Sequence, residues 1–181
     1  RRQSPAANQA IPALIDALSD NEQQVRFYAA LAFTEMGEDA SNAVPALTKI
    51  LANTGQTNSL FYLRAAVARA LGKIGPPAIN AIPELKKALK ETDPNFRGHT
   101  AVAIWRIDSD VATALPVLLK EMPWISEHSK WDWIIALGEM GPHAREAVPQ
   151  LKKELKEDDQ KWVREYVTNA LMKIDPDAFT N

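Results

Sequence analysis

The sequence predicts an all-α solenoid, a stack of five two-helix repeats. A short Ala-x-Pro-x-Leu phrase occurs five times, an amphipathic phrase follows each copy, and the two phrases alternate without exception. Successive prolines of the first phrase are 33, 38, 33 and 33 residues apart. Such periods are typical of helical arrays in which each repeat packs on its neighbours. We expect a single domain with repeats at about 5–37, 38–75, 76–108, 109–141 and 142–175.

The first phrase is predicted to begin a helix with its proline. The fixed φ and missing N–H of proline are tolerated in a first helical turn. A helical turn before the proline would instead place a kink there, and the sequence leaves both possibilities open. The irregular step of 38 comes from five extra residues within 52–59, where Gly and polar residues predict a loop.

The second phrase has the spacing of one helical stripe. Apolar residues recur at i, i+4, i+7, i+8 and i+11, with alanine always in the middle, so that a neighbouring backbone can approach closely. Gly37, Gly75 and Gly141 stand where a left-handed residue ends a helix. We expect Asp108 and Asp175 to take that place in the other two repeats.

Composition excludes several classes of function. The 181 residues contain 21 Lys and Arg against 23 Asp and Glu, without the basic excess of a nucleic-acid binder. There is no cysteine, no apolar run near the roughly 20 residues of a membrane span, and no signal-peptide pattern. The three histidines lack metal-ligand spacing. We therefore expect no cofactor, metal, nucleic acid or membrane partner, and the sequence does not indicate a compartment.

Both ends of the sequence look like parts of further repeats. Residues 1–3 fit the tail of an earlier helix, and residues 175–178 fit the start of a sixth repeat. We expect the segment to belong to a longer protein.

The aligned pattern A-V-P-x-L … V-R-x-x-A-A-x-A-L-x-x-I-G resembles HEAT repeats, specifically the bacterial HEAT-like type also called phycobilisome-lyase repeats. The resemblance covers about Ser4 to Ala178 and is most faithful in Leu63–Gly75 and Gly141–Leu155. It implies a right-handed superhelix with the second helices on its concave side, and a general role in protein–protein binding. Repeat four departs from the pattern, because Ser129 and Lys130 replace the Val-Arg pair.

A row of basic residues stands eleven positions before the last residue of each second phrase. The resemblance implies that this row is a structural ladder between repeats, in which each Arg pairs with a turn aspartate, and not a grip on an acidic partner. Asp20, Asp93 and Asp158 stand four to six residues before their Arg, as that pairing requires. The row consists of Arg26, Arg64, Arg97, Lys130 and Arg164.

The second helices are also predicted to present an apolar face. At 100° per residue, three aligned positions point away from the core stripe. Exposed apolar patches usually mark interaction sites, and Trp is favoured in them. The alternative is that a tight superhelix buries these side chains against one another. We expect Gly98 and Gly138 to leave room beside the tryptophans. The expected contact residues are Phe27, Leu31, Arg69, Val102, Trp105, Trp131 and Ile135.

The predicted function is therefore a non-catalytic scaffold, favoured as a monomer, that binds a peptide or protein segment on the concave face. No hydrolase elbow, P-loop or dinucleotide motif occurs, so we expect no enzyme. The resemblance also leaves open a bilin lyase or chromophore-lyase chaperone, and a HEAT-type DNA-repair glycosylase. A structural spacer appended to an enzyme is a further alternative.

Overall fold

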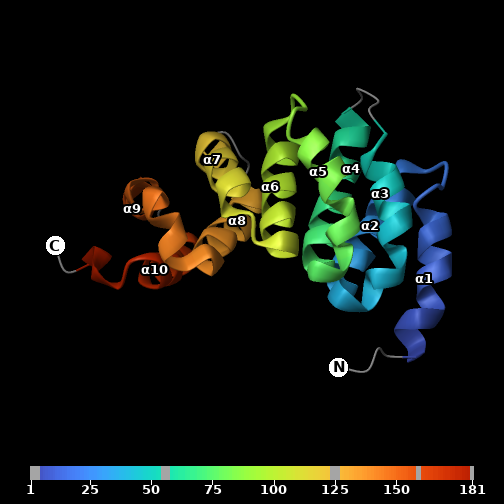
Figure 1. Ribbon diagram of the computed structural model, residues 1–181, viewed down its shortest axis with the longest axis horizontal. Helices are drawn as coiled ribbons and strands as arrows, with labels where there is room; N and C mark the ends of the chain where they lie inside the picture. Colours follow the sequence, from blue (N-terminus) through green and yellow to red (C-terminus); the bar gives the residue numbers. More distant parts are fainter. Residues whose placement is uncertain (1–4, 54–57, 123–126, 158–159, 180–181) are drawn as a thin grey trace. The chain divides into compact units, whose positions relative to one another are not determined.

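The computed structural model describes residues 5–53, 58–122, 127–157 and 160–179, and within these ranges all regular structure is helical (Figure 1). This confirms the all-α prediction. The helices form five successive pairs: α1 (Pro5–Ala17) with α2 (Gln23–Met36), α3 (Val44–Leu51) with α4 (Asn58–Ile74), α5 (Ile82–Ala88) with α6 (Pro94–Asp108), α7 (Val111–Glu121) with α8 (Glu127–Met140), and α9 (Val148–Glu157) with α10 (Lys161–Ile174).

The prolines of the first phrase have two different environments. In α3, α5 and α9 they lie in the first turn, and a 3-10 helix precedes each: η1 (Gly37–Ala43), η2 (Pro76–Ala81) and η4 (Gly141–Ala147). In α1 and α7, Pro12 and Pro116 lie inside the helix, so the other possibility that the sequence left open, a helical turn before the proline, applies there. The α7 helix begins earlier because the Asp110 carboxylate accepts a hydrogen bond from the Thr113 backbone N–H at 3.0 Å.

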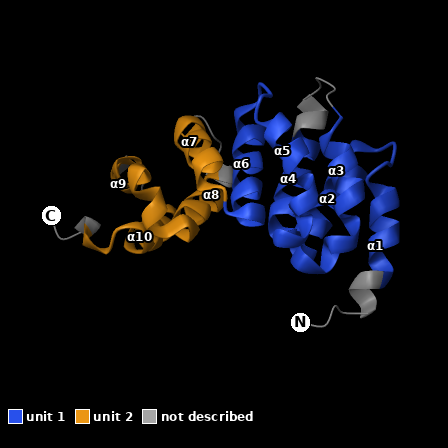
Figure 2. Ribbon diagram, viewed as in Figure 1, with its two compact units in different colours: residues 1–109 blue, residues 110–181 orange. Residues whose placement is uncertain are grey.

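The chain packs as two compact units, residues 1–109 and 110–181 (Figure 2). The division falls after the third helix pair. In unit 1, α4 packs against both α2 and α6. In unit 2, α10 packs against α8 and α9.

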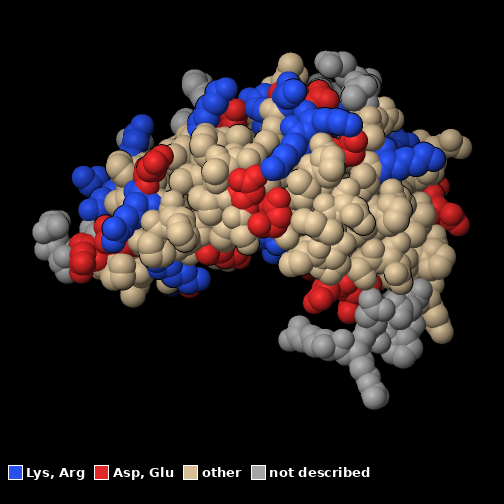
Figure 3. Space-filling model, in the orientation of Figure 1, with Lys and Arg blue, Asp and Glu red and all other residues tan. Residues whose placement is uncertain are grey.

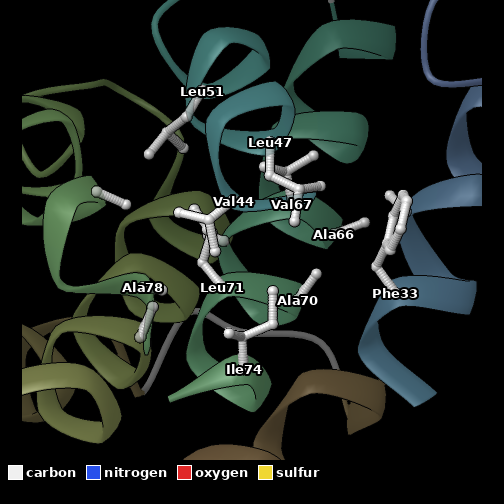
Figure 4. Packing of buried hydrophobic residues seen from close by; sticks show 14 of the residues in the cluster. Phe33, Val44, Leu47, Leu51, Ala66, Val67, Ala70, Leu71, Ile74 and Ala78 are labelled. Atoms are coloured by element: carbon white, nitrogen blue, oxygen red, sulfur yellow. The ribbon is translucent and has the colours of Figure 1, made fainter. Parts of the chain in front are cut away.

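The core of unit 1 comes from the predicted stripe of the second helices and from the leucines of the first helices. Phe33, Leu47, Val67 and Leu71 are fully buried and converge between α2, α3 and α4 (Figure 4). The same stripe of α10, from Val163 to Ile174, is buried in unit 2. The period of 3.6 residues therefore identified the buried side of these helices correctly.

Small residues let neighbouring second helices approach closely within each unit. A Cβ added to Gly72 would lie 2.9 Å from Cα of Ala103, and one added to Gly138 would lie 3.0 Å from Cα of Ala170. The α10 backbone therefore fills the space beside Gly138. The expectation that Gly138 leaves room for a partner is wrong.

The ends of the second helices follow the prediction only where glycine is present. Gly37, Gly75 and Gly141 have positive φ angles of 56°, 74° and 58°. In repeat three, α6 continues through Asp108 and the left-handed residue is Ser109, with φ 61° and ψ 25°. Asp175 has φ −150°, which is extended backbone. The predicted left-handed role of both aspartates is therefore wrong.

Candidate functional site

The arginines of the basic row bind backbone carbonyls after the first helix of their own repeat. Nη1 of Arg26 donates to the carbonyl oxygens of Asp20 and Asn21 at 2.7 and 2.8 Å. Nη1 of Arg97 donates to the carbonyl oxygen of Glu91 at 2.6 Å, and Nε of Arg64 donates to that of Leu51 at 3.1 Å. The Leu51 carbonyl is at the C-terminus of α3, where a helix leaves its acceptors without intrahelical partners, and the other three carbonyls lie in the turn between the two helices.

The turn aspartates have a different role from the one expected. Oδ1 of Asp20 accepts from the Glu22 backbone N–H at 2.7 Å, and Oδ1 of Asp93 accepts from the Phe96 backbone N–H at 2.7 Å. The Asp93 carboxylate thus caps the start of α6, whereas the Asp20 carboxylate closes the turn just before α2. Asp158 lies outside the described residues. In repeats one and three, the predicted Arg–Asp pairing is replaced by aspartate–backbone N–H bonds and arginine–carbonyl bonds.

Two residues of the basic row form ion pairs with a glutamate of the next repeat. Nη1 of Arg64 lies 3.1 Å from Oε1 of Glu91 in the next repeat, and its guanidinium sits 4.5 Å above the Phe96 ring centroid. Arg64 is only 2% exposed. In unit 2, Nζ of Lys130 lies 2.9 Å from Oε2 of Glu154. Lys130 of the divergent repeat four therefore still contacts repeat five. Arg164, the last residue of the basic row, is exposed.

The residues predicted to contact a partner have unequal exposure. Phe27, Leu31, Arg69 and Trp105 are partly exposed in unit 1, and Trp131 and Ile135 are partly exposed in unit 2. Val102 is 2% exposed and offers almost no surface. Helical phase alone therefore did not separate exposed from buried side chains at this position.

A pocket of about 190 Å³ opens between the N-terminal halves of α2 and α4. Phe27 lines it together with Tyr28, whose ring lies edge-on at 5.9 Å between centroids. Tyr28 and Tyr62 are each 66% exposed, an unusual state for aromatic side chains. We call this the aromatic pocket, lined by Gln23, Gln24, Phe27, Tyr28 and Tyr62.

Sequence reasoning missed Tyr28 and Tyr62. A signal was present for Tyr62, because it lies seven residues before Arg69 and therefore on the same side of α4. The expected contact row stopped one turn short of it. Tyr28 follows Phe27 and aligns with Ala66 of repeat two, which is buried. Exposure at this aligned position therefore depends on the helices that surround it, which the sequence pattern does not give.

A larger hollow of about 570 Å³ lies at the C-terminal end of α2. Glu35, seven residues after Tyr28 on the same side of α2, lines this hollow. Figure 3 shows acidic side chains gathered at the lower edge of unit 1. We call this the acidic hollow, lined by Glu35, Met36, Gly37, Glu38, Asp39, Ser41 and Pro77.

Two models of HEAT repeats match the chain, one over residues 10–40 and the other over residues 56–122, together more than half of its length. The chain belongs to the HEAT-repeat family.

Two solved structures share the fold of this HEAT-repeat protein. One is the crystal structure of an engineered protein, with 22% identity and a TM-score of 0.60 over 91% of this chain and 78% of that chain. The other is the complex of CpcE and CpcF of phycocyanin lyase from Nostoc sp. PCC7120, with 22% identity and a TM-score of 0.52 over 90% of this chain and 98% of that chain. No curated protein matches the sequence. At this identity the likeness shows the fold alone.

Across the described parts of the HEAT-repeat protein, no three His, Cys, Asp or Glu side chains are grouped so that they could hold a metal ion. None of the helices described has the length and apolar character needed to cross a bilayer. The candidate functional site is the aromatic pocket together with the acidic hollow at the C-terminal end of α2, both in unit 1.

Proposed function

We propose that this HEAT-repeat protein is a non-catalytic scaffold that binds a peptide or protein segment on the concave face of its second helices. The aromatic pocket is the observation that carries the proposal. Two tyrosines that are each 66% exposed flank Phe27 there, whereas a surface that meets only water rarely collects aromatic side chains. Tyrosine rings provide a large contact area and a polar end, which makes them frequent anchors at protein interfaces.

The same side of unit 1 adds contacts of other kinds. Leu31 lies between the aromatic pocket and the acidic hollow on α2. Arg69 lies seven residues, about two helical turns, after Tyr62 on the same side of α4. Trp105 adds a partly exposed aromatic side chain on α6. In unit 2, Trp131 and Ile135 are partly exposed on α8 and are proposed as contact residues of that unit. We do not include Val102 in the contact surface, because it is buried.

The test is selection of binding peptides from a displayed random library, followed by titration against variants of the whole chain. We expect Leu31→Asp, Trp105→Ala and Trp131→Ala to weaken binding about tenfold or more while the far-ultraviolet circular dichroism stays unchanged. Lys86→Ala on the exposed side of α5 is the control and should have no effect. Peptides that bind all three face variants normally, or that lose binding with Lys86→Ala, would disprove the proposal.

Handling of a chromophore is a second candidate, favoured by the fold-level likeness to the CpcE–CpcF complex. Size and charge argue against the two hollows of unit 1. The aromatic pocket, at about 190 Å³, is smaller than the roughly 300–1,000 Å³ of most small-molecule sites. The larger hollow is lined by Glu35, Glu38 and Asp39, which would repel the propionate groups of a bilin. An absorbance shift on mixing free bilin with the protein would favour this candidate over the scaffold.

A further inference from the structure

We propose that the aromatic pocket and the acidic hollow together recognise an extended, proline-containing peptide with a basic residue three or four positions from the proline. The inference rests on the proposed function and specifies the chemistry of the bound segment. The proline ring enters the aromatic pocket, and the basic side chain reaches the acidic hollow at the other end of α2.

The aromatic pocket fits one ring-sized apolar group. Its volume of about 190 Å³ is close to the roughly 150 Å³ of a protein cavity that binds benzene. Phe27, Tyr28 and Tyr62 supply aromatic walls, and none of the described residues that line the pocket is charged. A pyrrolidine ring meets these conditions, and aromatic-lined grooves are a common way to bind proline-rich segments.

The polar groups at the rim favour an extended backbone. Gln23 and Gln24 carry amide donors, and the two tyrosines carry hydroxyl donors. A polyproline II segment has no internal hydrogen bonds, so its carbonyl groups can accept from these donors. A bound α-helix has already used its carbonyls internally. A bound β-strand requires an exposed sheet edge, and the described ranges of the chain contain no strand to provide one.

The spacing of the two hollows sets the distance between proline and basic residue. Tyr28 and Glu35 are seven residues apart on α2, which at 1.5 Å per residue is about 10 Å along the helix axis. A polyproline II segment rises about 3.1 Å per residue, so three or four residues cover this distance. Glu35, Glu38 and Asp39 give the hollow the charge that attracts Lys or Arg.

The experiment titrates short fluorescent peptides with the whole chain and follows fluorescence anisotropy. The test peptides carry a Pro-Pro pair with an Arg three positions after it or, in the reversed order, three positions before it. Matched peptides replace the prolines with Ala or the Arg with Gln, and a further peptide forms an apolar amphipathic helix. The protein variants are Tyr62→Ala and the double variant Glu35→Gln/Glu38→Gln. Tyr166→Ala and Glu165→Gln on α10 are the controls, because they change exposed side chains of the same types in unit 2.

We expect one of the two Pro–Arg peptides to bind, and Tyr62→Ala to weaken it about tenfold. The double glutamine variant should weaken binding about threefold at low salt and have little effect at about 1 M salt, where the screening length falls to roughly 3 Å. Both α10 controls should bind normally. The inference is overturned if the Pro→Ala or Arg→Gln peptide binds equally well, if the helical peptide binds better, or if Tyr62→Ala changes nothing. Library-selected peptides that depend on Leu31 would sustain the scaffold proposal in each of these cases.

Discussion

At the scale of single residues, Arg64 joins two neighbouring repeats. Its side chain is buried and contacts the Leu51 carbonyl of its own repeat, the Glu91 carboxylate of the next repeat and the face of Phe96. A buried pair of this kind fixes the register of two elements more surely than it adds net stability. Removing one partner is costly all the same, because the other partner stays buried without its counter-charge.

We expect Arg64→Ala to lower the free energy of unfolding by about 3–5 kcal/mol. Arg26→Ala is the matched control, because the Arg26 side chain donates to the exposed carbonyls of Asp20 and Asn21, and it should cost about 1 kcal/mol. Urea denaturation followed by circular dichroism measures both. Equal losses for the two variants would show that the contact with Glu91 and Phe96 does not matter.

The basic row shows what the sequence could and could not predict at this scale. Eleven-residue spacing identified Arg26, Arg64 and Arg97 as equivalent, since equivalence depends only on helical phase. It could not assign their acceptors. Which oxygen lies near a guanidinium depends on the path of the turn, and in Asp20 and Asp93 the carboxylates are already bound to backbone N–H groups.

At the scale of the helix, the repeats differ most in how each first helix begins. A proline in the first turn costs little, whereas one inside a helix removes a hydrogen bond and crowds the preceding turn. Pro83 in α5 is of the first kind and Pro116 in α7 is of the second. Both prolines stand in the same Ala-x-Pro-x-Leu pattern, but α5 begins at Ile82, one residue before Pro83, whereas α7 begins at Val111, five residues before Pro116, where Asp110 caps it.

This difference predicts opposite effects for the same substitution. Pro116→Ala should raise the free energy of unfolding by about 1–2 kcal/mol, because the restored N–H can bond within α7. Pro83→Ala should lower it by about 0.5–1 kcal/mol, because proline restricts the unfolded chain without disturbing the start of α5. Both side chains are exposed, so packing changes little. Thermal melts of the two variants provide the measurement, and a shift in the same direction for both would contradict the account.

The candidate site was predicted only in part for a similar reason. Periodicity placed Phe27, Leu31 and Arg69 on the side away from the core, and the structure leaves all three partly exposed. Periodicity could not show that Val102 is buried or that Tyr28 and Tyr62 are open, because exposure depends on the surrounding helices and not on phase within one helix.

At the scale of the whole molecule, the chain divides after the third helix pair. In repeat arrays, stability is close to a sum of terms for each repeat and each neighbouring interface. A defect in one unit should therefore act mainly on that unit. Gly72 and Gly138 provide a matched pair for this question, because each lies against the backbone of the next second helix, one in each unit.

We expect Gly72→Ala to increase hydrogen exchange in α4 and α6 and to leave α8 and α10 nearly unchanged. Its new Cβ would meet backbone atoms of Ala103 that cannot move without shifting α6, a cost of about 1–3 kcal/mol. Gly138→Ala should show the reverse pattern, with faster exchange in α8 and α10. Hydrogen exchange read by mass spectrometry measures both variants. Uniform loss of protection along the chain would show that the two units unfold together.

The position of Glu91 has a consequence for how such an array can grow. Its side chain binds Arg64 of the preceding repeat, while its carbonyl binds Arg97 of its own repeat. A gene duplication that copied only residues 38–75 would carry Arg64 without its carboxylate and would depend on the new neighbour to supply one. A segment that begins with α4 and extends through the turn after α5 carries both partners, so the pair that can be inserted intact joins the second helix of one repeat to the first helix of the next.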